Sequence, residues 1–287
     1  MFLHKIGRLL DSSRTRNNSW KPKFNLFYIS SCRRNEHIAT MSHTDHSTGT
    51  QVKGKKISVE GNIAAGKSTF LRLVSSAHEG WSFVAEPLRK WQHVQSSSHQ
   101  GMDNLLQLMY EDPARWSYTF QTLSCMGRFK TQIEPFSEKL LKQREPVQIF
   151  ERSVYSDRFV FAKSLFELGH LNEMEWSLYQ EWHSFLIQEF GNRATLDGIV
   201  YLRATPGKCF ERLQKRARKE EKTVTEKYLE KLHDQHESWL INKTTDVYFE
   251  QIKKIPILVL DVEEEFEDDP VANEYLCMKT KAFLDGL

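Results

Sequence analysis

One octapeptide constrains the fold of this chain more than any other stretch. Residues 61–68 read GNIAAGKS, which fits the phosphate-binding pattern GxxxxGK[ST]. A short apolar segment, KKISVE, precedes it, and TFLRLVSSA, with helical spacing, follows it. In a strand–loop–helix of this kind, backbone N–H groups and a helix N-terminus surround phosphate oxygens. The chain is therefore predicted to bind a nucleoside triphosphate.

The residue types in this loop predict separate roles. The Lys67 ammonium reaches the outer phosphates, and the Ser68 hydroxyl can ligate Mg²⁺. The glycines allow the backbone N–H groups to turn toward phosphate oxygens. The residues assigned to the triphosphate are Gly61, Asn62, Ile63, Ala64, Ala65, Gly66, Lys67, Ser68 and Thr69.

Five short, nearly continuously apolar segments alternate with helical sequence after residue 54. They are KKISVE, WSFVAEP, PVQIFE, DGIVYLRATP and IPILVLDV. This alternation predicts an α/β fold: a P-loop kinase-type, five-stranded parallel sheet flanked by helices on both faces. Ligands of such sheets bind at the carboxyl ends of the strands. Glu86, Glu151 and Asp261 end strands there, and the pattern alone leaves both Glu151 and Asp261 open as partners of Mg²⁺.

Three local predictions concern the segments between these strands. Residues 103–141 have apolar side chains at threes and fours and are predicted to be a long helical stretch. Ser156 is predicted to cap the helix that follows the third strand. His233 and His236, in an HxxH pattern without a third ligand at useful spacing, are predicted to be surface histidines and not a zinc site.

Charge is distributed unevenly along the chain. Residues 1–40 hold eight Lys/Arg and two acidic residues, so the 40 basic and 38 acidic residues of the whole chain leave 32 and 36 beyond them. The body of the chain is not basic, which argues against a nucleic-acid partner. The Arg-rich, Ser-containing, acid-poor leader is typical of a mitochondrial transit peptide. Residues 1–40 are therefore predicted to be a transit peptide and residues 41–54 a flexible linker.

Further features concern the compartment. Translation from Met41 would give a form without the leader, which is expected in the cytosol. No stretch approaches 18 apolar residues, so no membrane insertion is expected. The four cysteines lack CxxC spacing and are typical of reduced thiols in an intracellular protein.

Several longer motifs occur together in this sequence. They are SVEGNIAAGKSTF, AEP, PARWSYTFQT, VQIFERSVYSDRFVFAK and RARKEE. In this order and spacing they resemble the deoxyribonucleoside kinase family, and the likeness covers nearly all of the predicted kinase domain, residues 55–287. It is nearest to the mitochondrial members that act on deoxyguanosine, and next to those that act on deoxycytidine. The resemblance implies transfer of the γ-phosphoryl group of ATP, with Mg²⁺, to the 5′-hydroxyl of a deoxynucleoside, and a homodimer in the mitochondrial matrix.

The resemblance also implies roles for three residues at strand ends. Glu86 is expected nearest the 5′-hydroxyl, and Glu151 is expected close to both the metal and the hydroxyl. Which of the two carboxylates is the general base stays open. Arg152 is expected to bond the 5′-oxygen and the transferring phosphate. Phosphoryl transfer needs such positioning and neutralisation of charge.

Three arginines are expected to form a lid over the phosphates. A spacing of four places Arg212 and Arg216 on one helical face, with Arg218 about 120° further round. Without the resemblance, a solvated charged helix is the simpler interpretation. By resemblance, Glu264, Glu265 and Phe266 line the adenine of ATP, which places the strand of Asp261 on the side of that base.

The nucleoside site rests on the resemblance. Gln121 is expected to read the base edge, and Phe120 and Phe161 to enclose the base. Tyr110 and Glu221 are expected to hold the 3′-hydroxyl. The Tyr110 ring would leave no room for a 2′-hydroxyl, which selects deoxyribose.

The purine preference rests on Ser124 and on the overall likeness, beside a predicted buried pair that contacts the base. A buried arginine is costly unless paired, so Arg128 is expected to pair with Asp157. Held in this way, its guanidinium can donate to O6 and N7 of a purine. Ser124, where the deoxycytidine enzymes have alanine, resembles the deoxyguanosine enzymes and adds a polar group.

Three functions remain in competition at this point. The first is a kinase of purine deoxynucleosides, deoxyguanosine and deoxyadenosine. The second is a deoxycytidine kinase-type enzyme of broader specificity. The third is an inactive, nucleotide-sensing P-loop subunit, against which the intact Lys67, Glu86, Glu151 and Arg152 argue.

Overall fold

The predicted strands all form and join into one parallel sheet. The computed structural model describes residues 54–78, 80–95 and 101–287; the predicted transit peptide and residues 41–53 of the predicted linker lie outside the described residues. The strand order is β2-β5-β1-β6-β7. The bounds are β1 (Lys55–Gly61), β2 (Trp81–Val84), β5 (Val147–Glu151), β6 (Gly198–Arg203) and β7 (Ile257–Asp261). The predicted α/β fold with a five-stranded parallel sheet is confirmed.

The register of the sheet brings the strand ends together. β1 lies at the centre, and Val59 is level with Glu151 of β5 on one side and with Val200 of β6 on the other. The chain leaves β1 toward β2 and β5 and later returns to β6 and β7 on the opposite side. This change of direction opens a crevice at the carboxyl ends of the central strands.

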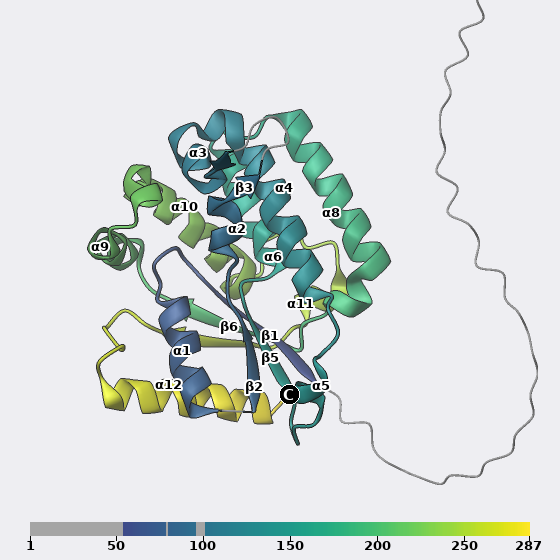
Figure 1. Ribbon diagram of the computed structural model, residues 1–287, viewed down its shortest axis with the longest axis vertical. Coiled ribbons are helices and arrows are strands. Elements are labelled where there is room, and N and C mark those ends of the chain that lie inside the picture. Colours follow the sequence, from purple (N-terminus) through teal and green to yellow (C-terminus); the bar gives the residue numbers. More distant parts are fainter. Residues whose placement is uncertain (1–53, 79, 96–100) are drawn as a thin grey trace, which may run out of the picture. The chain divides into compact units, whose positions relative to one another are not determined.

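Helices cover both faces of the sheet (Figure 1). On one face α1 contacts α12, and on the other lie α4, α6, α8 and α10. The helices so far named are α1 (Lys67–Ala77), α4 (Pro113–Gln132), α6 (Val154–Ser156), α8 (Glu173–Ala194), α10 (Glu226–His236) and α12 (Pro270–Asp285). The others are α2 (Leu88–Gln92), α3 (Leu105–Glu111), α5 (Glu138–Leu141), α7 (Lys163–Glu167), α9 (Pro206–Arg216), α11 (Glu250–Lys253), the 3₁₀ helix η2 (Lys219–Thr223) and the π-helices η1 (Asp157–Ala162) and η3 (Glu237–Ile241).

The predicted long helix over residues 103–141 is interrupted. α3 ends at Glu111, and α4 begins at Pro113 with the Asp112 carboxylate accepting from the Arg115 N–H. Proline suits the first helical turn because its missing N–H would have no partner there, so Asp112-Pro113 starts a new helix. A short antiparallel pair, β3 (Val94–Gln95) and β4 (Met102–Asp103), precedes α3 and was not predicted.

The turn after β5 is capped by a different serine from the one predicted. Ser153 is the N-cap of α6, and its hydroxyl accepts from the Ser156 N–H at 3.4 Å while the Ser156 hydroxyl accepts from the Ser153 N–H at 3.3 Å. The prediction of Ser156 as the cap is therefore wrong. This reciprocal capping satisfies N–H groups that the first turn leaves without partners.

No helix in the described part of the chain is both long and apolar enough to span a bilayer.

Candidate active site

A cavity of about 420 Å³ opens at the carboxyl ends of β1, β2 and β5. It brings together most of the residues that the sequence assigned to the site. These are Ile63, Ala64, Gly66, Lys67, Ser68, Thr69, Glu86, Tyr110, Phe120, Gln121, Ser124, Arg128, Glu151, Arg152, Asp157, Phe161, Arg212, Arg216, Arg218, Glu221, Glu265 and Phe266. The predicted Gly61, Asn62, Ala65 and Glu264 do not line it.

The phosphate loop has a backbone that only glycine accommodates at two points. Gly61 and Gly66 have φ of 147° and 92°. A Cβ at Gly61 would lie 2.6 Å from the Leu202 carbonyl oxygen, and one at Gly66 would lie 2.8 Å from Cζ of Phe266. The loop therefore lies tightly against β6 and the Phe266 ring, and it leads directly into the N-terminus of α1.

Lys67 is enclosed by this loop. Its Nζ donates to the Asn62 carbonyl at 2.7 Å and to the Gly61 carbonyl at 3.3 Å. Burial, together with the positive charge of Arg152, lowers the pKa of Lys67 to about 7. Near neutral pH this amine is therefore poised between its charged and uncharged forms.

Nucleotide binding is accordingly expected to take up protons at Lys67. The phosphates stabilise the ammonium form, so the pKa of Lys67 rises in the complex, with uptake of about 0.9 proton per site at pH 8 and about 0.1 at pH 6. Calorimetric titration of a non-hydrolysable ATP analogue with excess Mg²⁺, in buffers of different ionisation enthalpy, measures this uptake. A Lys67→Arg control, which is always charged, is expected to show none. Identical enthalpies in all buffers at pH 8 would contradict the assignment.

Glu151 and Ser68 form the oxygen-rich part of the cavity. The Ser68 hydroxyl donates to Glu151 Oε1 at 2.9 Å. A hydroxyl and a carboxylate are hard oxygen donors, which suit Mg²⁺ that keeps several waters and phosphate oxygens as its other ligands. Asp261 ends β7, two strands away from β1, and its carboxylate accepts from the Glu263 N–H at 3.0 Å. The geometry therefore favours Glu151 over Asp261 as a candidate ligand of Mg²⁺.

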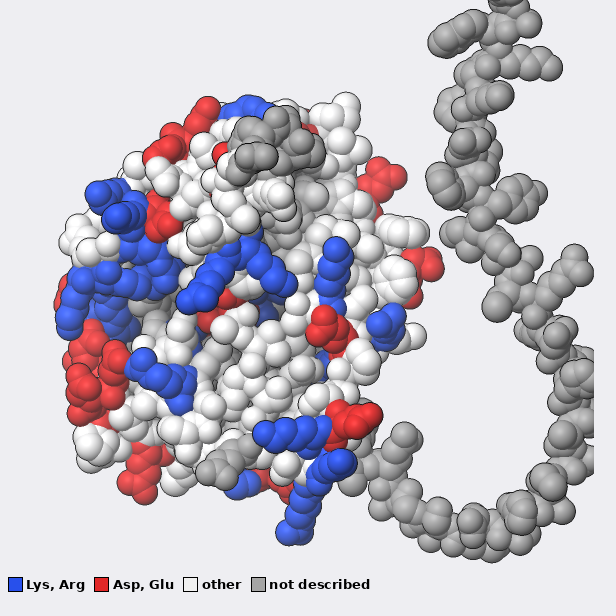
Figure 2. All heavy atoms as spheres, viewed as in Figure 1, with Lys and Arg blue, Asp and Glu red and all other residues white. Residues whose placement is uncertain are grey.

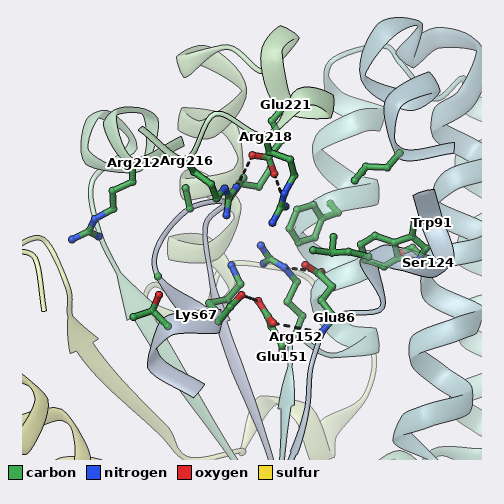
Figure 3. A pocket seen from close by; sticks show the side chains of 18 of the residues that line it. Lys67, Glu86, Trp91, Ser124, Glu151, Arg152, Arg212, Arg216, Arg218 and Glu221 are labelled. Atoms are coloured by element: carbon green, nitrogen blue, oxygen red, sulfur yellow. Dashed lines mark hydrogen bonds and ion pairs between the residues drawn. The ribbon is translucent and has the colours of Figure 1, made fainter. Parts of the chain in front are cut away.

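Glu86 is held between two arginines, Arg128 and Arg152, of which Figure 3 shows Arg152 beside it. Its Oε1 accepts from Arg128 Nη2 at 2.9 Å and lies 3.2 Å from Arg152 Nε. Burial acts to raise the pKa of Glu86, but Arg152, Arg128 and Lys67 together bring that pKa below its ordinary value. The carboxylate is therefore ionised at neutral pH and can accept a proton.

Arg152 is fixed by the central strand. It has φ of 67°, its N–H donates to the Val59 carbonyl at 3.0 Å, and its Nη1 donates to the Gly61 carbonyl at 2.6 Å. The guanidinium lies 4.5 Å from the centre of the Phe161 ring. A left-handed backbone at a residue other than glycine persists only where its surroundings hold it, which these contacts do.

The predicted Arg128–Asp157 pair forms. Arg128 Nε donates to Asp157 Oδ2 at 2.9 Å, and the Ser124 hydroxyl donates to Oδ1 at 3.2 Å. Both members of the pair are buried. Arg128 Nη1 also donates to the Glu151 carbonyl at 2.7 Å. One guanidinium thus contacts the end of β5, Glu86 and Asp157 at the same time.

Sequence reasoning missed part of the wall around this pair. Trp91 of α2 is buried, its ring lies 5.3 Å from that of Phe120, edge-on, and 5.9 Å from the Arg128 guanidinium. Leu88, Leu106, Met109 and Tyr228 also line the cavity. The sequence offers one local indication that Trp91 belongs to the site: it follows Glu86, at the end of the predicted second strand, by a few residues.

Two of the three predicted lid arginines share one acidic partner. Arg216 Nη2 and Arg218 Nη1 donate to the buried Glu221 carboxylate at 2.6 and 2.9 Å. α9 ends at Arg216 and Ala217 has φ of 51°, so Arg218 lies beyond the helix, and its predicted position on that helix is wrong. The Arg212 side chain points away from the other labelled residues in Figure 3 and contacts Glu265 at 3.0 Å and the Val262 carbonyl at 2.8 Å.

Basic residues mark this side of the surface. Figure 2 shows Lys and Arg side chains gathered over α9, with Asp and Glu side chains below them. Tyr110 lines the cavity on the other side, where burial raises the pKa of its hydroxyl well above the ordinary value and keeps it protonated. A polyanion is therefore favoured beside α9, and a neutral polar ligand is favoured beside Tyr110.

Arg158, for which the sequence suggested no role, faces away from this cavity. Its Nη1 donates to the Ser184 hydroxyl at 2.8 Å and to the Gln180 carbonyl at 3.3 Å. It also lies 3.3 Å from Nδ1 of His183, whose Nε2 bonds the Val154 carbonyl. Burial lowers the pKa of His183 to about 3, so the neutral ring accepts at Nδ1 from Arg158. Arg158 thus fastens η1 to α8.

The prediction that both HxxH histidines lie at the surface is wrong for His236. That side chain is buried, stacks on Tyr201 at 5.7 Å and lies 6.4 Å from the Phe161 ring. Burial lowers the pKa of His236 well below its ordinary value. Among the described residues, no three His, Cys, Asp or Glu side chains form a group that could hold a metal ion.

Comparisons with known proteins agree with this geometry. Residues 57–285 match the family model described as deoxynucleoside kinase. The chain is 65% identical to mitochondrial deoxyguanosine kinase of Xenopus laevis over 251 residues, which is 85% of this chain and 95% of the relative. It is 51% identical to deoxycytidine kinase 2 of Gallus gallus over 249 residues, 84% and 94% of the two chains. It is 46% identical to deoxycytidine kinase of Homo sapiens over 255 residues, 86% and 96% of the two chains.

Proposed function

Because this chain belongs to the deoxynucleoside kinase family, we propose that it transfers the γ-phosphoryl group of ATP to the 5′-hydroxyl of purine deoxynucleosides, with deoxyguanosine preferred. The observation that carries the preference for deoxyguanosine is the Ser124 hydroxyl, which donates to Asp157 of the buried Arg128–Asp157 pair. The Arg128 guanidinium is held in one plane and can donate to O6 and N7 of guanine. Deoxyadenosine, with the same N7, is the second expected substrate.

The residues of the cavity divide the reaction among them. Glu86 accepts the proton of the 5′-hydroxyl, and Arg152 stabilises the charge on the transferring phosphoryl group and the 5′-oxygen. Lys67 and the loop N–H groups hold the outer phosphates, and Arg216 and Arg218 approach from the lid. Ser68 and Glu151 would hold Mg²⁺, which neutralises phosphate charge when bound.

The other side of the cavity is assigned to the nucleoside. The base lies between Phe120 and Phe161, and Gln121, buried in α4, bonds its edge. Tyr110 and Glu221 hold the 3′-hydroxyl, and the Tyr110 ring excludes a ribose. Glu265 and Phe266 line the adenine of ATP beside the phosphate loop, and Glu264, outside the cavity lining, is expected to contribute through its backbone.

A panel of deoxynucleosides tests this proposal. We expect kcat/KM for deoxyguanosine to exceed that for deoxycytidine, and deoxyadenosine to be phosphorylated. A higher kcat/KM for deoxycytidine would favour a deoxycytidine kinase-type enzyme, a function supported by the 46–51% identical relatives. Binding of ATP without phosphorylation of any deoxynucleoside would instead indicate an inactive sensing subunit.

The Arg128–Asp157 pair is expected to exclude thymidine from the cavity, and removing the pair should allow thymidine to bind. Arg128→Met with Asp157→Ala leaves apolar room for the thymine methyl and no buried unpaired charge. The ratio of kcat/KM for thymidine to that for deoxyguanosine should rise about 10-fold or more. Because Arg128 also bonds Glu86, turnover of all substrates is expected to fall, so the ratio is the informative quantity. A folded double variant with an unchanged ratio would refute the assignment.

A homodimer is part of the proposal. Met174, Leu178 and Phe185 are exposed and recur at helical spacing on one face of α8, and Leu123 of the neighbouring α4 is also partly exposed. A second copy of the chain would cover this apolar face. Analytical ultracentrifugation showing a monomer at micromolar concentration would contradict it.

The localisation proposed is the mitochondrial matrix, by way of residues 1–40. It is supported by the composition of that segment and by the 65% identical relative, which is named as mitochondrial. A product comprising residues 41–287 is expected in the cytosolic fraction of cells whose mitochondria import the full-length chain. Finding that shorter product inside mitochondria would overturn the assignment of the leader.

A further inference from the structure

The 3₁₀ helix η2 carries two neighbouring glutamates that bond in opposite directions. Glu221 is 3% exposed and pairs with Arg216 and Arg218 of the lid. Glu220 bonds away from the lid, because its Oε1 accepts from Gln92 Nε2 at 2.8 Å and from Asn104 Nδ2 at 2.9 Å. One short segment is thus hydrogen-bonded to both sides of the cavity.

The partners of Glu220 belong to elements that line the nucleoside side. Gln92 is the last residue of α2 and follows Trp91, which packs against Phe120. Asn104 is the N-cap of α3, the helix that carries Tyr110. A shift of η2 would therefore pull on both α2 and α3 through one carboxylate.

A second contact ties η2 to the same helix. The Thr223 hydroxyl donates to the Tyr110 carbonyl at 3.0 Å. Glu220 therefore holds the start of α3 and Thr223 holds its end, while Glu221 lies between them and engages Arg216 and Arg218 (Figure 3). The bonds of Glu220 are charge-assisted, since a carboxylate accepts both.

We propose that Glu220 is a positioning residue that couples occupation of the nucleoside side to binding of the triphosphate by the lid arginines. A bound nucleoside that holds α2 and α3 in place also fixes the position of the Glu220 side chain. The orientation of Glu221, Arg216 and Arg218 is then fixed through η2. By linkage, the triphosphate must favour nucleoside binding by the same factor. The hydrogen bond from Asn104, with that from Gln92, lowers the pKa of Glu220, so it stays ionised at neutral pH. The inference rests on the proposed placement of nucleoside and ATP in the cavity.

Equilibrium binding of a non-hydrolysable ATP analogue, with and without saturating deoxyguanosine, tests the coupling. In the wild type, deoxyguanosine is expected to tighten binding of the analogue about 5-fold or more, and in Glu220→Ala less than about 2-fold. Glu220→Gln retains an acceptor for both amides and is expected to retain most of the coupling. Glu211→Ala is the matched control, because Glu211 is exposed and its carboxylate pairs with Lys208 of its own helix.

A double-mutant cycle separates this role from a general loss of stability. Gln92→Ala alone should reduce the coupling, and adding it to Glu220→Ala should reduce it little further, because both remove the same contact. The inference is overturned if deoxyguanosine tightens binding of the ATP analogue equally in the wild type and in Glu220→Ala. It is overturned as well if deoxyguanosine does not tighten that binding in the wild type. It is also overturned if the two changes act additively. If the wild type fails to bind one of the ligands on its own, the proposed function fails instead.

Discussion

Glu86→Gln is expected to lower kcat by about 10²- to 10⁴-fold, the usual contribution of a positioned general base. The amide keeps the size of the side chain and can still accept from Arg128, but it cannot take the proton of the 5′-hydroxyl. The KM for deoxyguanosine should change much less than kcat, since the base pocket is left intact. Steady-state kinetics with saturating Mg²⁺ and ATP provide the measurement.

Glu151→Gln is the informative companion to this variant. Because Glu151 bonds Ser68, its loss should mainly raise the Mg²⁺ concentration needed for half-maximal activity. If Glu151→Gln abolished turnover at every Mg²⁺ concentration while Glu86→Gln changed only the Mg²⁺ requirement, the two roles would have to be exchanged.

Arg152→Ala should lower kcat by about 10³-fold or more, as expected for an arginine that stabilises a transferring phosphoryl group. Arg152→Lys should recover only part of this loss, because an ammonium cannot reproduce the fork that contacts Glu86 and the Gly61 carbonyl together. The exposed Arg193 provides a control: Arg193→Ala should leave kcat within about 2-fold of the wild type.

The backbone at this position allows the chemical role to be separated from folding. Arg152 has φ of 67°, which glycine adopts without strain. Arg152→Gly therefore removes the side chain while relieving the backbone, and its melting temperature should fall less than that of Arg152→Ala. A Gly variant that is well folded and retains more than about a tenth of wild-type kcat would rule out the proposed role.

The parts of the fold that could be predicted from sequence are those with local causes. The phosphate loop has a motif whose spacing reflects its own backbone, and the apolar strands are recognisable because both of their faces are covered. The break at Asp112-Pro113 also has a local cause, but the apolar periodicity continues across it and conceals it. For Ser153 and Ser156, both hydroxyls suit an N-cap, and only the backbone decides between them.

The arrangement of the site has causes that lie far apart in sequence. Arg128 meets Glu86 and Asp157 across 42 and 29 residues, because β2 and β5 are neighbours in the sheet and α4 packs against η1. Without the family resemblance, neither that meeting nor the lid would have been predicted. Trp91 and the burial of Arg158 and His236 were missed for the same reason: their partners belong to other elements.

The π-helix η1 holds one residue more than an α-helix would need over the same segment. A π-helical turn holds one residue more than an α-helical turn, so removing one residue from Asp157–Ala162 would let the chain continue as an α-helix. The residues after the deletion would keep nearly their present direction relative to α6, and the buried Leu165 could stay in the core. A deletion inside α8 would instead turn all following residues of that helix by about 100°. Single-residue deletions in η1 should therefore destabilise the fold less than single-residue deletions in α8.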